Sequence, residues 1–227
     1  MPDVPSQTFP EQPADLAVSA LDKPVLQRRV PLQQRGQQTV DQILQASAQV
    51  IEREGLDKLT TKRIAVEAGL SVGSVYEYFP NKEAVLSAMV VQWFDQLMHT
   101  LDAHHPSNTG CRDILSYLEG VMEAIRQDYV DQSALGAMLS ALGAIPALRE
   151  LVEQHDERVT ANMADALRVM VPTVPLEELR ATVRSIALVS HELMSEALVR
   201  NPALAARTLT HMKVCIFALV SHLLISR

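Results

Sequence analysis

The side chains of this chain that could act together chemically gather in one stretch, residues 60–82, TTKRIAVEAGLSVGSVYEYFPNK. Hydroxyls can bond to bases or phosphates, phenols and cations can hold phosphates, and small residues let a backbone approach base edges. The residues with these properties are Thr60, Thr61, Lys62, Arg63, Ser71, Val72, Gly73, Ser74, Tyr76, Tyr78 and Lys82. The stretch therefore has the composition of a contact with nucleic acid.

Two short helices joined by a tight turn would position these side chains. Thr60 can cap the first helix with its hydroxyl, and Gly69 stands where a left-handed residue ends a helix. Ser71 can cap a second helix, which Pro80 stops because its ring disfavours helical backbone in the residue before it. Asn81 can cap the helix that follows. Such a pair predicts a helix-turn-helix, whose second helix fits the major groove of DNA.

Aromatic residues in the second helix have two interpretations. Phe79 and Val75 fit best as core residues. Tyr76 and Tyr78 lie two positions apart, so both cannot face one apolar stripe, and a role for them at the DNA backbone stays open.

The spacing over residues 36–83 resembles a known family. The matching residues are Thr60-Thr61-Lys62-Arg63-Ile64-Ala65, Ala68-Gly69, Ser71-Val72-Gly73-Ser74-Val75-Tyr76 and Tyr78-Phe79-Pro80-Asn81-Lys82-Glu83. This pattern resembles the DNA-binding domain of the TetR (tetracycline repressor) family of bacterial transcription regulators. The rest of the chain resembles the family only in length, helicity and position.

The resemblance implies an all-α fold, with a three-helix helix-turn-helix domain followed by a helical ligand-binding and dimerisation domain. We expect a disordered extension over 1–34, the DNA-binding domain over 35–82 and the helical domain over 83–227. The resemblance also implies a function, repression from a palindromic DNA operator, bound as a dimer and released by a small, largely apolar inducer.

Charge is distributed in favour of a DNA partner although the net charge is −7. Residues 23–82 hold nine Lys and Arg against six Asp and Glu, whereas residues 1–22 hold four acids and no base. Arg28, Arg29 and Arg35 end the flexible extension, and such an arm can enter a minor groove or can be a solvated tail.

Cysteine usage and the length of apolar runs also indicate the cellular compartment. Cys111 and Cys215 are the two cysteines, a usage typical of a reducing cytoplasm. We see no signal peptide at the N-terminus. The longest apolar run, residues 214–225, falls short of the ~18–20 residues that cross a membrane, so we expect a cytoplasmic chain with no membrane partner.

Beyond residue 81 the chain reads as helical throughout. A helix over 81–104 has an apolar face too wide for one contact, and the resemblance implies that it links the DNA reader to the body. A loop is expected over 103–110, and helices over 111–129, 132–143, 146–171, 175–200 and 202–225. The last two helices carry continuous apolar stripes, and the final one is apolar nearly all round. This pattern predicts a two-fold four-helix bundle with a second copy.

A mostly apolar cavity in the body could take the inducer. The candidate lining residues are Trp93, Met98, Tyr117, Met122, His155, Met163 and Met194. The alternative interpretation, which is more common for any single methionine, is ordinary core.

No enzyme signature is found, since the sequence has no Gly-rich phosphate loop, no G-x-S-x-G and no H-E-x-x-H. His211 and Cys215 have a spacing that can hold zinc, but a third ligand is missing nearby, and we expect no metal and no cofactor.

Two other functions stay open. One is a helix-turn-helix dimer that organises DNA or responds to a protein partner, with a filled core. The other is a helical small-molecule carrier or enzyme that does not bind DNA.

Overall fold

Helices form every regular element in the part of the chain described by this computed structural model, residues 34–131, 134, 138 and 148–225. The DNA-reader segment contains α1 (Gln34–Glu54), the 3-10 turn η2 (Leu56–Lys58), α2 (Thr61–Glu67) and α3 (Val72–Tyr78). The remainder contains α4 (Lys82–His104), α5 (Pro106–Thr109), α6 (Ile114–Asp131), α8 (Arg149–Met170), α9 (Leu176–Ser195), the π-helical turn η4 (Glu196–Arg200), η5 (Pro202–Leu204) and α10 (Ala205–Ile225). The predicted all-α fold is confirmed.

Caps define the helix-turn-helix as the sequence predicted. Thr60 Oγ1 accepts a hydrogen bond from the Arg63 amide at 3.2 Å, and Ser71 Oγ accepts one from the Ser74 amide at 3.0 Å. Asn81 Oδ1 accepts from the amide of the third residue of α4 at 2.8 Å. Gly69 has φ +64°, a left-handed conformation that a residue with a Cβ adopts at a cost.

We call α1, α2 and α3 together the head. Its core consists of side chains with no solvent exposure, including Ile43, Leu59, Ile64, Val75 and Phe79. The predicted core roles of the last two are therefore confirmed. Outside the core, the Gln42 side-chain amide of α1 donates to the Ala68 carbonyl at the end of α2, at 2.9 Å.

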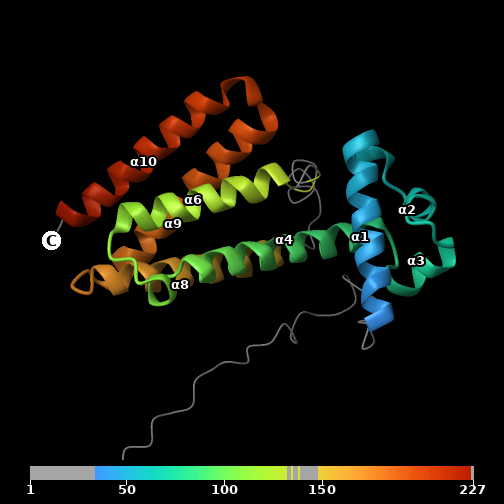
Figure 1. Ribbon diagram of the computed structural model, residues 1–227, viewed down its shortest axis with the longest axis horizontal. Coiled ribbons are helices and arrows are strands. Elements are labelled where there is room, and N and C mark those ends of the chain that lie inside the picture. The colour runs from blue at the N-terminus through green and yellow to red at the C-terminus, as the bar shows by residue number, and fades with distance from the viewer. Residues whose placement is uncertain (1–33, 132–133, 135–137, 139–147, 226–227) are drawn as a thin grey trace, which may run out of the picture.

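The long helix α4 joins the head to the body. Its first turns lie against α1, and its far end packs among α5, α6 and α8 (Figure 1). Buried residues occur around much of its circumference, from Val85 and Leu86 to Trp93, Phe94 and Leu101. This burial agrees with a face too wide for a single contact.

The body differs from the sequence expectation in its connections. A short helix, α5, occupies the expected loop, with Pro106 in its first turn and Gly110 left-handed at its end. The expected helix over 175–200 divides into α9 and the π-turn η4. Most of the expected helix 132–143 lies outside the described residues, as do residues 1–33 with Arg28 and Arg29, whereas Arg35 lies in the first turn of α1.

The last helix presents apolar side chains on both of its faces. Met212, Ile216, Val220 and Leu223 are buried, and α10 packs along α9 (Figure 1). On the other face Val214, Phe217 and Leu224 are 61, 57 and 41% exposed.

The sequence argument underestimated the apolar length of this helix, which by itself is weak evidence for a membrane span. By length and composition alone, Pro202–Ile225 could cross a membrane, with mean hydropathy 1.6 and 22% of the window buried. The sequence argument counted uninterrupted apolar runs, whereas a helix that crosses a membrane tolerates isolated polar residues. Packing of one face against α9 nevertheless makes α10 part of the folded body.

Candidate nucleic-acid interface

Helix α3 lies at the outer edge of the head and begins with small, exposed residues (Figure 1). Ser71, Val72 and Gly73 are exposed, and Ser74 is half-buried. The hydroxyls of Ser71 and Ser74 lie 2.7 Å apart, so each already has one hydrogen-bonding partner. A Cβ on Gly73 would meet Ser71 Oγ at 3.6 Å, an ordinary contact. Packing within the fold therefore does not require glycine at this position.

The two tyrosines of α3 have different environments. Tyr76 is 40% exposed and its hydroxyl accepts a hydrogen bond from Thr61 Oγ1 at 3.1 Å. Tyr78 is half-buried and packs against the hydrophobic core. The Thr61–Tyr76 bond joins the first turn of α2 to the exposed side of α3, so residues from both helices form one polar surface.

Two predicted cations lie at helix starts. Lys62 is exposed in the first turn of α2, and Lys82, half-buried, is the first residue of α4. The amides at a helix start and its positive dipole end favour an anion, so the position of Lys82 is compatible with the phosphate contact that the sequence predicted.

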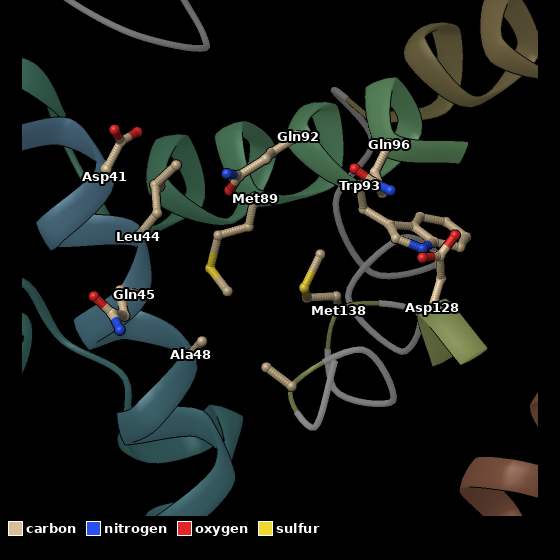
Figure 2. A pocket seen from close by; sticks show the side chains of 11 residues that line it. Asp41, Leu44, Gln45, Ala48, Met89, Gln92, Trp93, Gln96, Asp128 and Met138 are labelled. Carbon is tan, nitrogen blue, oxygen red and sulfur yellow. The ribbon is translucent and has the colours of Figure 1, made fainter. Parts of the chain in front are cut away.

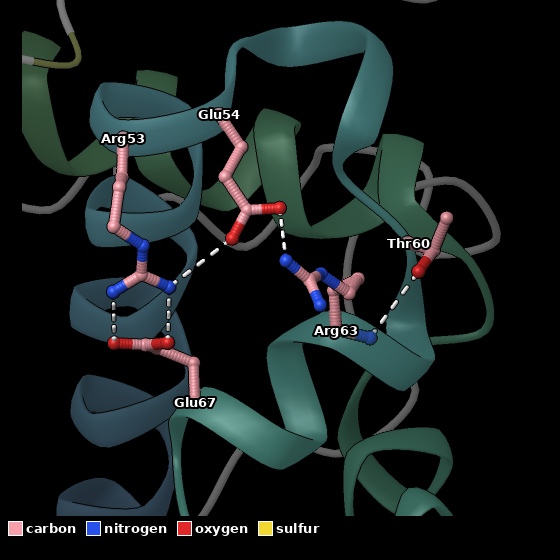
Figure 3. Close-up of polar contacts among 5 residues, drawn as sticks. All are labelled: Arg53, Glu54, Thr60, Arg63 and Glu67. Atoms are coloured by element: carbon pink, nitrogen blue, oxygen red, sulfur yellow. Dashed lines mark hydrogen bonds and ion pairs between the residues drawn. The ribbon is translucent and has the colours of Figure 1, made fainter.

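Arg63, by contrast, points toward α1 (Figure 3). Its guanidinium is paired with Glu54, the last residue of α1. Arg53 is paired with both oxygens of Glu67, at 3.1 and 2.6 Å, and also reaches Glu54 at 3.2 Å. The hydrogen bond from Arg63 holds the pKa of Glu54 below its ordinary value, and the bond from Arg53 does the same for Glu67. We call these four residues the head ion network.

Acids slightly outnumber bases in the head, which contains the proposed interface. Residues 36–82 hold five Lys and Arg against six Asp and Glu. The excess of bases that the sequence predicted therefore depends on Lys23 and on the arginines of the N-terminal arm.

Among the described residues, two pockets are relevant to ligand binding. The first, of about 520 Å³, opens between α1 of the head, α4 and α6 (Figure 2), and we call it the junction pocket. It is lined by Asp41, Leu44, Gln45, Ala48, Met89, Gln92, Trp93, Gln96, Asp128, Ala134 and Met138. Of the described residues that line it, two are carboxylates and none is Lys or Arg.

The second pocket, of about 170 Å³, lies between α4, α8 and α9, and we call it the body pocket. The His155 ring lies parallel to that of Phe94, with centroids 3.7 Å apart, and His155 Nδ1 is buried without a hydrogen-bond partner among the described atoms. Burial, with a smaller effect from the charge of Arg158, lowers the pKa of His155 to about 4.

The structure brings only part of the predicted ligand pocket together. Trp93 and His155 both line the body pocket, and Trp93 also lines the junction pocket. Met98 is half-buried, and Tyr117, Met122, Met163 and Met194 are buried, but none of these five lines either pocket. Burial raises the pKa of Tyr117 well above its ordinary value.

The described residues hold no group of three His, Cys, Asp or Glu side chains that could bind one metal ion. The residues that sequence reasoning missed are Glu54 and the polar lining of the junction pocket. They come from separate helices and carry no local motif, so only the packing of α1 on α2 and α4 brings them together.

Comparisons with known proteins agree with this geometry. Residues 43–89 match the family described as bacterial regulatory proteins, tetR family. A helix-turn-helix transcriptional regulator from the dhlA 5′ region of Xanthobacter autotrophicus is 24% identical over 127 residues, which are 56% of this chain and 62% of that protein. The match therefore spans less than two thirds of that relative's length.

Solved structures show the same fold. A TetR-family regulator from Mesorhizobium loti superposes with a TM-score of 0.65, covering 83% of this chain and 98% of that one at 17% identity. SmeT in complex with triclosan gives a TM-score of 0.60 over 80% of this chain and 90% of its own at 19% identity. The relatives are named as transcription regulators, in agreement with the prediction that the chain is not an enzyme. Residues 43–89 therefore match the TetR-family DNA-binding domain, and the described fold as a whole resembles those of TetR-family regulators.

Proposed function

We propose that the chain is a cytoplasmic transcription repressor that binds a near-palindromic operator as a homodimer and releases it when a small ligand binds. The observation that carries the proposal is the capped helix α3, exposed at the edge of the head with small and hydroxylated residues at its start. A helix of this kind can enter the major groove with its N-terminal residues at the base edges.

The roles of the DNA-facing residues divide by position. Lys82, Tyr76 and Tyr78 hold phosphates and set the register of α3. Lys62, Val72, Gly73 and Ser74 face base edges. Thr60 and Ser71 cap their helices, and Thr61 supports Tyr76 through its hydrogen bond.

Dimerisation follows from the outer faces of α9 and α10. Val214, Phe217 and Leu224 form an exposed apolar stripe on α10, and Leu188 of α9 is 55% exposed. Exposed apolar patches of this kind are uncommon on monomers, because their burial against a partner is favourable. A second copy would cover the stripe in a four-helix bundle and place two heads on successive turns of the duplex, about 34–36 Å apart.

The ligand site is assigned to the junction pocket. Its volume of about 520 Å³ lies within the range of small-molecule sites. It contacts α1 of the head as well as α4 and α6, so an occupant touches both parts that must move relative to each other. Ligand shifts the dimer toward a head separation that does not fit the operator, to the extent that it binds that state more tightly.

The lining favours a positively charged, largely apolar ligand. Asp41 and Asp128 supply negative charge, and the ring of Trp93 can contact a cation through its face. Because Trp93 is the only tryptophan, its fluorescence reports occupancy of the junction pocket or of the body pocket, which it also lines. Phenyltrimethylammonium should quench or shift this emission at lower concentration than its uncharged isostere, tert-butylbenzene. Equal responses to the two compounds would contradict the charge assignment.

A second candidate function, a DNA-binding dimer without a small ligand, is favoured by one observation. Five of the seven predicted pocket residues line neither pocket and contribute to core packing. The absence of any Trp93 response across a library of amphipathic cations would support this function.

Selection of bound genomic fragments tests DNA binding. Purified protein should enrich fragments that contain an inverted repeat, and Ser74→Ala should weaken their retention. Ser116→Ala, an exposed serine at the start of α6, is the matched control and should bind as the parent does. The absence of any enriched sequence over bulk competitor would contradict the proposal.

A further inference from the structure

We propose that Glu54 limits the sequence-independent affinity of this chain for DNA, because it withholds the Arg63 guanidinium from DNA phosphates. The inference rests on the proposed DNA-binding function, but it concerns a residue of α1 that lies outside the set expected to touch DNA.

Arg63 begins at the edge of the proposed interface. It is in the first turn of α2, directly after the exposed Lys62 and two residues after Thr61, which bonds to Tyr76 of α3. Its side chain keeps 51% of its exposure, so solvent and a polyanion can reach it. Its guanidinium is nevertheless directed at the carboxylate that ends α1 (Figure 3).

Within the head ion network, the Glu54 carboxylate is mainly the partner of Arg63 rather than of Arg53. Arg53 is already neutralised by two bonds to Glu67, at 3.1 and 2.6 Å, and its contact with Glu54 is the longer one at 3.2 Å. Loss of the charge on Glu54 therefore leaves the Arg53–Glu67 pair intact and releases Arg63. A single substitution can thus test the withheld charge without dismantling the contact between α1 and α2.

One additional cation at the proposed interface should have a measurable effect on DNA binding, because the head carries few cations. With five Lys and Arg against six Asp and Glu over residues 36–82, the head has few cations for phosphates. A phosphate contact carries no sequence information and strengthens binding to every duplex alike. Release of Arg63 would therefore raise the affinity for random DNA, and for the operator by the same factor.

The salt dependence of the DNA-binding constant measures whether Arg63 makes an additional phosphate contact. Each additional phosphate contact steepens the fall of log K with log salt by about 0.9 on B-DNA. Glu54→Gln should show this added slope on a random-sequence duplex and bind it several-fold more tightly at low salt. That advantage should shrink about threefold between about 50 and 200 mM salt, as the added slope requires.

Arg63→Gln supplies the internal comparison. Alone, it should leave the slope on random DNA unchanged, because Arg63 is already withheld. In the double variant it should cancel the gain of Glu54→Gln. Glu157→Gln is the matched control, since it breaks an exposed Glu–Arg pair with Arg180 between α8 and α9 and makes the same change in net charge. It should bind random DNA as the parent does.

Two results would overturn the inference. An unchanged slope for Glu54→Gln, with a lower melting temperature, would make Glu54 a clamp between α1 and α2 only. A slope reduced by about 0.9 for Arg63→Gln alone would show that Arg63 already contacts phosphate in the parent complex.

Failure of the proposed function would look different, because the parent would then bind no duplex. Elution from heparin, a polyanion that requires no operator, tests the release of Arg63 even when the parent binds no duplex. Glu54→Gln should elute at higher salt than the parent and the double variant, and equal elution of all three would contradict the inference by itself.

Discussion

His155 should make the stability of this protein strongly dependent on pH between 7 and 5. Its pKa is lowered to about 4 in the folded chain because it is buried against Phe94. In an unfolded chain a histidine titrates near ~6.5. Between these values the unfolded state binds a proton that the folded state refuses, so stability is present above pH 6.5 and is lost as the pH falls. The two pKa values correspond to a loss of about 2 kcal/mol between pH 7 and pH 5.

His155→Phe isolates this contribution, because a phenyl ring can keep the contact with Phe94 but cannot be protonated. Urea unfolding of parent and variant at pH 7 and pH 5, at one protein concentration, gives the comparison. The parent should lose about 2 kcal/mol more than the variant. His99→Phe, an exposed position on α4, is the control and should retain the parental loss, because it leaves His155 in place. An equal loss in His155→Phe and the parent would refute the assignment of a neutral, buried imidazole.

Three further predictions concern DNA binding and assembly. Lys82→Ala should weaken binding to all duplexes alike and lower the salt slope by about one unit in a fluorescence-anisotropy titration, and an unchanged slope would remove Lys82 from the phosphate contacts. Ser74→Ala should cost on the order of 1–3 kcal/mol on the operator selectively, and an equal loss on random DNA would reassign Ser74 to the backbone. Phe217→Glu places a charge in the proposed interface of both copies, where burial of each ring is worth about 1.5–3 kcal/mol, so sedimentation should show dimerisation weakened on the order of 100-fold. Val130→Glu, a comparably exposed apolar position on α6, should sediment as the parent does.

The local structure of the head could be predicted from the sequence because caps are short-range chemistry. Thr60, Ser71 and Asn81 each bond to an amide three residues ahead, and Gly69 has the left-handed backbone that the turn requires. The helix α5 could have been predicted by the same logic, because Pro106 and Gly110 are start and stop signals. The sequence analysis instead expected a loop over 103–110.

The candidate sites were less accessible to sequence reasoning because they depend on contacts between distant residues. Nothing local pairs Arg63 with Glu54 rather than with phosphate. The junction pocket likewise combines Asp41, Gln92 and Asp128 from three different helices. Trp93 was among the predicted lining residues and does line both pockets, whereas a buried methionine such as Met163 has the same sequence pattern whether it faces a cavity or fills the core.

The stoichiometry and symmetry of a complex with selected DNA test whether the chain binds a two-fold operator as a dimer. Operator fragments enriched from genomic DNA would be footprinted and weighed by sedimentation with the full chain. A dimer on a palindromic operator should show two chains per site and two protected half-sites related by inverted symmetry, centred about one helical turn apart. A complex with one chain per site, or protection without a repeated half-site, would contradict it.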